Sequence, residues 1–234
     1  MQNIKDKVAY ITGGTKGIGF GIAKSLIEAG VKVAISGRNM EDLEKAKHEL
    51  GNQNVIAIQA DVTDFEDEKK AVDAVVEKFG KLDIIIANAG MGTFAPVDEM
   101  SLDDWNAMIN TNLTGAFHTL KAGVEQLKEN KGYLISIASL AGTNFFAQGA
   151  GYNATKFGLV GFTQAAMLDL RNYDVKCTTI MPGSVTSNFN GHIPNEEDHW
   201  KIQPADIGQM VVDLLKMNQN VLPSKIEVRP TKTK

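Results

Sequence analysis

The sequence is poor in cysteine, and this scarcity limits the class of protein. Cys177 is the only cysteine among 234 residues, which excludes a disulfide-stapled secreted scaffold. It lies in an apolar, strand-like run, where a lone thiol behaves as a small buried hydrophobe. The four histidines show no spacing with each other or with Cys177 that suggests a metal site. We therefore expect no bound metal.

The chain also lacks long apolar runs and an excess of basic charge. No apolar run approaches the roughly 18 residues that a membrane-spanning helix requires. Residues 1–6 are polar and lead straight into a strand, unlike a signal peptide. The formal net charge is -4, and this mild acidity argues against nucleic-acid binding. These absences predict a soluble, cytoplasmic protein that binds neither membrane nor nucleic acid.

What the chain does have is a regular alternation of short apolar strands and helical patterns. The run at 82–87 is apolar apart from Asp83, as expected of a strand buried on both faces of a parallel sheet. We predict an α/β fold, a single doubly wound (Rossmann-type) parallel sheet of about seven strands with helices on both faces. The predicted strands span 7–11, 31–35, 54–60, 82–87, 133–138, 175–181 and 225–228.

Residues 1–234 are predicted to form one dinucleotide-binding and catalytic domain, because no linker, repeat or low-complexity segment divides them. Two connections, 91–100 and 183–203, look irregular. Long irregular connections are often functional, so we expect 183–203 to be a substrate loop. Residues 231–234 are expected to be a disordered tail.

The first strand runs into a glycine-rich turn, which reads TGGTKGIG from Thr12 to Gly19. Its spacing is not G-x-G-x-x-G, but its glycines allow the same tight turn and close approach to a pyrophosphate at a helix N-terminus. The alternative is a glycine-rich turn that binds no ligand. The cofactor-binding candidates here are Gly13, Thr15, Lys16, Gly17, Ile18 and Gly19.

The end of the second strand bears on the choice of dinucleotide. An acid there would bind the ribose 2′-hydroxyl, but the sequence reads Ser36-Gly37-Arg38 and has no acid before Glu41. The guanidinium of Arg38 suits a 2′-phosphate, and Lys16 adds a second cation. These residues favour NADPH over NADH. The alternative is that both cations are solvated surface side chains.

A second motif, Tyr152-x3-Lys156, lies in a helical run. Residues four apart share a helix face. A cation about 5 Å from a phenol stabilises the phenolate by up to roughly 3 kcal/mol. Lowering the pKa of the phenol from 10 to 7 requires roughly 4 kcal/mol. The spacing is therefore compatible with a proton donor supported by a lysine. It is equally typical of an ordinary amphipathic helix.

Taken in order, the motifs resemble the short-chain dehydrogenase/reductase family from Lys7 to about Met217. The glycine turn matches the cofactor turn of that family, and Ser139 lies thirteen residues before Tyr152, where the family places its catalytic serine. The remaining matches are Asp61 and Val62 at the adenine, Asn88, Ala89 and Gly90 after the fourth strand, the catalytic Asn112, and Pro182, Gly183, Val185 and Thr186 at the nicotinamide.

The resemblance implies hydride transfer between NADP(H) and a small-molecule ketone, aldehyde, 3-oxo compound or alcohol. Tyr152 would be the general acid or base, Lys156 would support it and bind the nicotinamide ribose, Ser139 would hold the carbonyl oxygen, and Asn112 would anchor a relay water. Two alternatives stay open. One is a 3-oxoacyl-[acyl-carrier-protein] reductase of fatty-acid synthesis, which the lack of a terminal Asp-Gly-Gly turn puts in doubt, and the other is a non-catalytic NADP-binding sensor.

Two further expectations concern substrate and assembly. The family resemblance implies a homodimer or homotetramer formed through helices 102–129 and 149–171. Five apolar residues follow or flank the matched motifs and predict an apolar substrate pocket: Phe94, Leu140, Phe145, Phe146 and Phe189.

Overall fold

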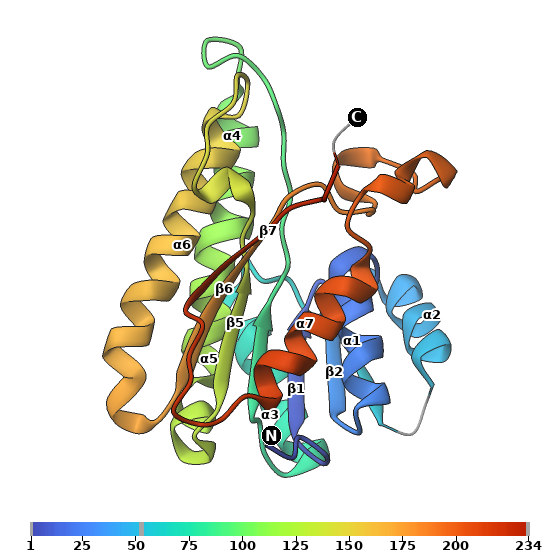
Figure 1. The fold of residues 1–234 in the computed structure, drawn as a ribbon, viewed down its shortest axis with the longest axis vertical. Coiled ribbons are helices and arrows are strands. Elements are labelled where there is room, and N and C mark those ends of the chain that lie inside the picture. Colours follow the sequence, from blue (N-terminus) through green and yellow to red (C-terminus); the bar gives the residue numbers. More distant parts are fainter. Residues whose placement is uncertain (1, 52–53, 233–234) are drawn as a thin grey trace.

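Seven parallel strands form one sheet in the order β3-β2-β1-β4-β5-β6-β7 in the computed structural model, which describes residues 2–51 and 54–232 (Figure 1). This confirms the predicted doubly wound α/β fold. Residues 233–234 of the predicted tail lie outside the described residues, whereas Thr231 and Lys232 are exposed bends. The strands are β1 Val8–Thr12, β2 Lys32–Gly37, β3 Val55–Gln59, β4 Ile84–Ala87, β5 Tyr133–Ile137, β6 Lys176–Pro182 and β7 Lys225–Val228.

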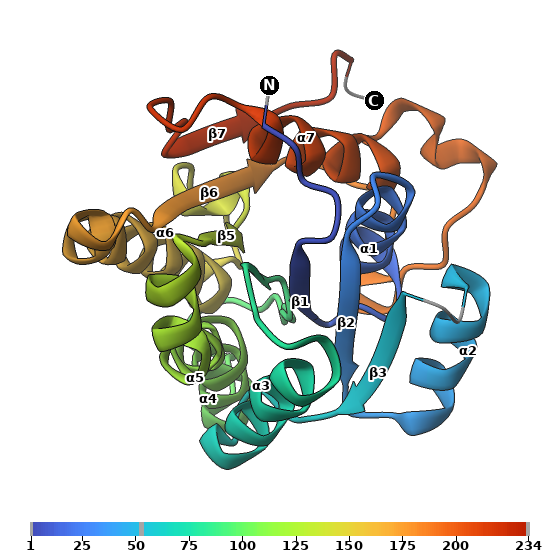
Figure 2. The ribbon, with the colours of Figure 1, turned by 90° about the horizontal axis from the view of Figure 1, so that it is seen from below.

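Helices cover both faces of the sheet, as Figure 2 shows end-on. The apolar side chains of α1, α2 and α7 pack against one face, and those of α3, α5 and α6 pack against the other. No helix within the described ranges is long and apolar enough to cross a membrane. The α-helices are α1 Gly17–Glu28, α2 Met40–Leu50, α3 Phe65–Phe79, α4 Leu102–Ile109, α5 Gly115–Asn130, α6 Ala150–Leu170 and α7 Pro204–Lys216.

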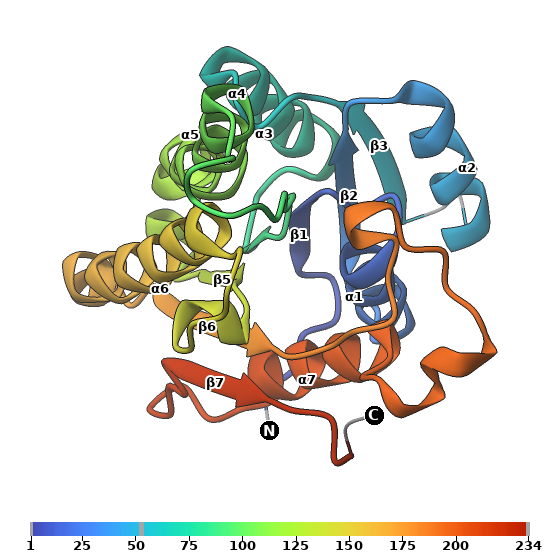
Figure 3. The ribbon, with the colours of Figure 1, turned by 90° about the horizontal axis from the view of Figure 1, so that it is seen from above.

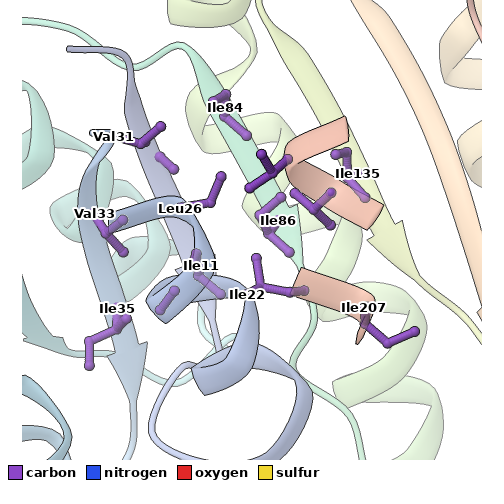
Figure 4. Close-up of a cluster of buried hydrophobic side chains, with 14 of the residues drawn as sticks. Ile11, Ile22, Leu26, Val31, Val33, Ile35, Ile84, Ile86, Ile135 and Ile207 are labelled. Carbon is purple, nitrogen blue, oxygen red and sulfur yellow. The ribbon is translucent and has the colours of Figure 1, made fainter. Parts of the chain in front are cut away.

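The larger part of the core lies between the sheet and the α1/α7 layer. In Figure 4, Ile22 and Leu26 of α1 lie against Ile11 of β1 and Ile86 of β4, with Ile207 of α7 beside them. All five side chains are fully buried, and each contributes roughly 1.5–3 kcal/mol of hydrophobic stabilisation. This packing fixes the start of α1 beside the ends of β1 and β4.

Helix boundaries follow the capping signals of the sequence. The side chain of Asn39 accepts the backbone N–H of Asp42 at 3.0 Å, and the Ser101 hydroxyl accepts that of Asp104 at 3.0 Å. Gly30, with φ +83°, follows the last turn of α1, where a left-handed residue closes a helix.

The predicted helix 102–129 is interrupted. A π-helical turn, Asn110–Thr114, separates α4 from α5, and the N–H of Gly115 pairs with the carbonyl of Asn110. A π turn inserts one residue into the helix and is frequent at functional sites. Here it carries Asn112, which is 1% exposed. Sequence periodicity could not reveal this turn, because the apolar pattern continues on either side of it.

Two long connections rise above the carboxyl ends of the strands, one after β4 and one after β6 (Figures 1 and 3). We call residues 183–203 the lid. Asp198 organises it: its carboxylate contacts His192 Nε2 at 2.6 Å and forms an ion pair with Lys201. The hydrogen bonds from His192 and Lys201 hold the pKa of this carboxyl well below its usual range.

Candidate active site

The site lies where the strand order reverses, between β1 and β4. Ligands of doubly wound sheets bind at such a switch point, outside the carboxyl ends of the strands. Asn88 ties the two strand ends together, because its amide donates to the carbonyls of Thr12 at 2.8 Å and Gly13 at 3.1 Å. The Thr12 hydroxyl accepts the N–H groups of Asn88 and Ala89 in return, both at 3.1 Å.

The glycine turn presents bare backbone at this point. Gly13 and Gly17 have φ of +64° and +56°, a region that other residues avoid. A Cβ on Gly19 would lie 2.5 Å from Asn88 Nδ2, so only glycine fits between the turn and β4. The start of α1 follows directly in the sequence, and its first backbone N–H groups have no partner within the helix. These residues fit a pyrophosphate at a helix N-terminus.

A cavity of about 970 Å³ extends from this turn. Most predicted cofactor residues line it, namely Gly13, Thr15, Lys16, Gly17, Ile18, Arg38, Asp61, Val62, Asn88, Ala89, Gly90, Tyr152 and Lys156. The predicted residues outside its lining are Gly19, Asn112, Ser139, Pro182, Gly183, Val185 and Thr186. The hydroxyl of Thr186 is engaged inside the lid, with the Asp198 carbonyl at 3.3 Å and Gln203 Nε2 at 3.0 Å.

The cavity also has lining residues that sequence reasoning did not single out as site residues. Some lie at the end of a strand or just after it, and the parallel topology brings all strand ends to one edge, which is a signal that the sequence does contain. Others come from the two irregular connections. They are Ser36, Gly37, Asn39, Asp42, Ala60, Met91, Gly92, Thr93, Thr111, Ile137, Ala138, Ser187, Asn188, Asn190 and Gly191.

Two exposed cations line the cavity, Lys16 in the glycine turn and Arg38 just after β2. Neither Arg38 nor Lys16 forms an ion pair with any residue in the described part of the chain. The carboxylate of Asp61, by contrast, already has hydrogen-bond partners, because it accepts both the N–H and the hydroxyl of Thr63 at 2.9 Å. Free positive charge is therefore available at the end of β2.

Tyr152 and Lys156 lie on one face of α6, as predicted. Lys156 Nζ is 5.6 Å from the centroid of the Tyr152 ring and donates to the carbonyl of Ile137, at the end of β5, at 3.1 Å. The two side chains are buried, with 9% and 4% exposure. The ammonium is thus fixed between the phenol and the sheet.

Burial sets the pKa of both groups in the free chain. It raises the pKa of the Tyr152 phenol to about 12, and a hydrogen bond with the Ser139 side chain opposes this shift. Burial lowers the pKa of the Lys156 ammonium to about 8. The sequence-based estimate that one lysine nearly suffices to acidify the phenol is therefore wrong for the free chain, because desolvation raises the pKa of Tyr152 and outweighs the hydrogen bond with Ser139.

Ser139 follows β5 and faces this pair. Its hydroxyl accepts the N–H of Ala141 at 3.1 Å, which caps a short 3-10 turn, Leu140–Gly142. Asn153 of α6 steadies the same turn by donating to the Ala141 carbonyl at 2.6 Å. The turn and α6 therefore hold Ser139 against Tyr152.

Asn112 connects the loop after β4 to α6. Its amide exchanges two hydrogen bonds with the backbone of Met91, both at 2.8 Å, and donates to the Thr155 hydroxyl at 3.0 Å. That hydroxyl donates to the Tyr152 carbonyl at 2.8 Å. Both amide hydrogens of Asn112 are thus used, while Oδ1 keeps a free lone pair.

Aromatic rings surround the Tyr152 ring. Phe94 lies 5.6 Å from its ring and Phe189 of the lid lies 5.5 Å from it, centroid to centroid. Phe146 completes the group at 5.7 Å from Phe94. Phe145, also a predicted pocket residue, points elsewhere: it is 82% exposed and stacks on Phe157.

Comparison with known proteins places this site in a family. The model of the short chain dehydrogenase family matches residues 7–198. An uncharacterised oxidoreductase of Staphylococcus aureus (strain USA300) is 34% identical over 231 residues, which cover 98% of this chain and 100% of the relative. The chain belongs to the short-chain dehydrogenase/reductase family, whose members are oxidoreductases.

Two solved structures are especially similar. An alcohol dehydrogenase from the archaeon Thermococcus sibiricus, complexed with 5-hydroxy-NADP, is 31% identical with a TM-score of 0.91, over 97% of this chain and 98% of that chain. A short chain dehydrogenase from Burkholderia cenocepacia, in complex with NADP, is 28% identical with a TM-score of 0.89, over 98% of each chain.

Proposed function

We propose that this protein is an NADP(H)-dependent carbonyl reductase, which interconverts a ketone or aldehyde and the corresponding alcohol. One observation carries the proposal: the buried Tyr152 and Lys156 line the same cavity as the glycine turn, and Ser139 is hydrogen-bonded to Tyr152. The similarity to an alcohol dehydrogenase complexed with 5-hydroxy-NADP supports it. When bound, the nicotinamide supplies or accepts the hydride.

Tyr152 is the proton donor in this proposal. With a pKa of about 12, the phenol keeps its proton at neutral pH and can protonate an alkoxide as it forms. Ser139 donates a hydrogen bond to the same oxygen, where negative charge develops. Because the Tyr152 and Ser139 side chains are hydrogen-bonded to each other, both hydroxyls lie close enough to contact the same substrate oxygen.

Lys156 and Asn112 return the proton to Tyr152. With a pKa of about 8, Lys156 is mostly charged at pH 7 yet gives up a proton readily. A Cβ on Gly90 would lie 3.4 Å from Asn112 Oδ1 and 3.6 Å from Lys156 Nζ. Gly90 therefore leaves space between these two atoms, and a water there would accept from Nζ and donate to the free lone pair of Oδ1.

The proposed cofactor is NADP(H) rather than NAD(H). Arg38 and Lys16 stand free at the end of the cavity next to β2, where a 2′-phosphate would lie. A guanidinium binds phosphate through two parallel hydrogen bonds. The glycine turn holds the pyrophosphate, and Asn88 fixes that turn against β4.

The test replaces Tyr152 with phenylalanine, which removes the hydroxyl and keeps the ring. Tyr152→Phe is expected to lower kcat for NADPH-dependent ketone reduction by about 10²–10⁴-fold, with NADPH binding unchanged. Tyr173→Phe is the matched control, because Tyr173 is 50% exposed and remote from the cavity. Turnover within tenfold of the wild type in Tyr152→Phe would refute the proposed acid.

The proposed assembly is a homodimer or homotetramer formed through α5 and α6. These helices carry apolar side chains that the single chain leaves exposed. Phe117 is 48%, Phe157 37% and Leu168 54% exposed. Side chains of this size on neighbouring long helices are typical of a protein interface.

A further inference from the structure

Phe189 covers the reactive tyrosine from the lid side. Its ring lies 5.5 Å from the Tyr152 ring and 6.4 Å from the Phe94 ring. It lines the cavity and remains 36% exposed. Any substrate that brings a carbonyl to the Tyr152 hydroxyl must therefore share space with this ring.

Gly92 makes room for the Phe189 ring. A Cβ on Gly92 would lie 2.5 Å from Phe189 Cζ and 3.2 Å from Tyr152 Cδ2. No positive φ demands glycine at this position, so the requirement is steric. The absent side chain thus leaves a space beside Tyr152 and Phe94, which we call the slot and which the Phe189 ring now fills.

The charged groups of the lid offer nothing to an anionic substrate. Lys201 is the only lysine or arginine of the lid, and it is paired with Asp198, as is His192. The Asp198 side chain is 6% exposed, so its negative charge and the positive charge of Lys201 offset each other inside the lid. The side of the slot formed by the lid is therefore aromatic and without free positive charge.

We propose that Phe189 is a specificity-determining residue and that the slot selects carbonyl compounds with a flat, uncharged ring beside the carbonyl. The inference rests on the proposed reductase function. When a substrate enters the slot, the Phe189 ring moves aside and forms the wall of the slot on the lid side. A flat substrate ring contacts this wall in edge-to-face or offset geometry, whereas an aliphatic group of equal size does not.

The experiment compares acetophenone with cyclohexyl methyl ketone, which has the same number of carbons but no flat ring. Because the two ketones differ in intrinsic reactivity, the readout is the ratio of their kcat/KM values in each variant relative to the wild type. Phe189→Leu keeps an apolar side chain and removes the ring. It is expected to lower the acetophenone preference by about three- to tenfold, the range of one aromatic pair, mainly through KM.

Gly92→Ala provides an independent steric variant, since the new methyl group displaces Phe189 without removing it. It is expected to change the ratio in the same direction. Ile193→Ala is the control for disturbance of the lid, because Ile193 is 77% exposed and lies outside the cavity lining. This variant should keep the wild-type ratio within twofold.

Binding provides a readout that does not depend on turnover. Titration of 1-phenylethanol and 1-cyclohexylethanol into NADP⁺-loaded Tyr152→Phe protein should show tighter binding of the aryl alcohol. Adding Phe189→Leu should remove that difference. Reduction of both ketones with an unchanged ratio in Phe189→Leu and Gly92→Ala would overturn this inference alone. Failure of every carbonyl compound to oxidise NADPH would overturn the proposed function, and this inference with it.

Discussion

The buried ammonium of Lys156 should make the folded protein less stable at neutral pH than at pH 9.5. The unfolded lysine has a pKa of 10.5, and burial lowers the folded value to about 8. This difference corresponds to about 3 kcal/mol of destabilisation below pH 8. Between pH 8 and 10.5 the unfolded chain binds more protons than the folded chain, so stability rises with pH. From pH 7 to 9.5 the Lys156 contribution should recover about 2 kcal/mol.

Urea unfolding of the cofactor-free protein at several pH values measures this contribution. In Lys156→Met the charge is absent, so the difference in unfolding free energy between wild type and variant isolates the lysine from all other titrating groups. Between pH 7 and 9.5 the unfolding free energy of the wild type should rise by about 2 kcal/mol relative to that of the variant. Lys69→Met, an exposed lysine on α3, is the control and should follow the wild type. A constant difference across this range would refute the buried-charge reasoning.

Two further predictions concern the cofactor and the assembly. Arg38→Ala should weaken NADPH binding by about tenfold or more, which is the contribution of a charged hydrogen bond. It should change NADH binding by less than twofold. Arg171→Ala, at an exposed arginine, is the control. Equal effects on the two dinucleotides would contradict the 2′-phosphate role. Light scattering should give a dimer or tetramer of the 25.3 kDa chain, and Phe117→Asp should dissociate it; a monomeric wild type would contradict the proposed interface.

Local features of the sequence predicted the fold and much of the site. The glycine turn and the strands are set by backbone requirements of a few neighbouring residues. The parallel topology then brings the strand ends to one edge of the sheet. Asn88 was assigned through the family resemblance, and in the structure its amide holds the glycine turn.

Features that depend on tertiary contacts were not predictable. The π turn at Asn112 is one, because nothing local distinguishes it from an ordinary helical turn. The contact of Phe189 with Tyr152 is another, since it depends on how the lid folds back over Gly92. The sequence marked 91–100 and 183–203 as irregular, but it could not show that the two connections meet at one tyrosine.

The pKa values of Tyr152 and Lys156 show why residue spacing alone misjudges a site. The separation of the two side chains was inferred well, but the direction of the pKa shift of the phenol was not. The inference assumed an effective dielectric and left out the desolvation of the buried phenol, which dominates. Desolvation disfavours the charged form of both groups, so the free chain holds a neutral phenol beside a weakened ammonium. Such a pair is suited to donate a proton when negative charge forms on a substrate oxygen, and it is costly to keep folded until then. The proposed proton transfer, and not stability, is therefore what would account for a lysine at this buried position.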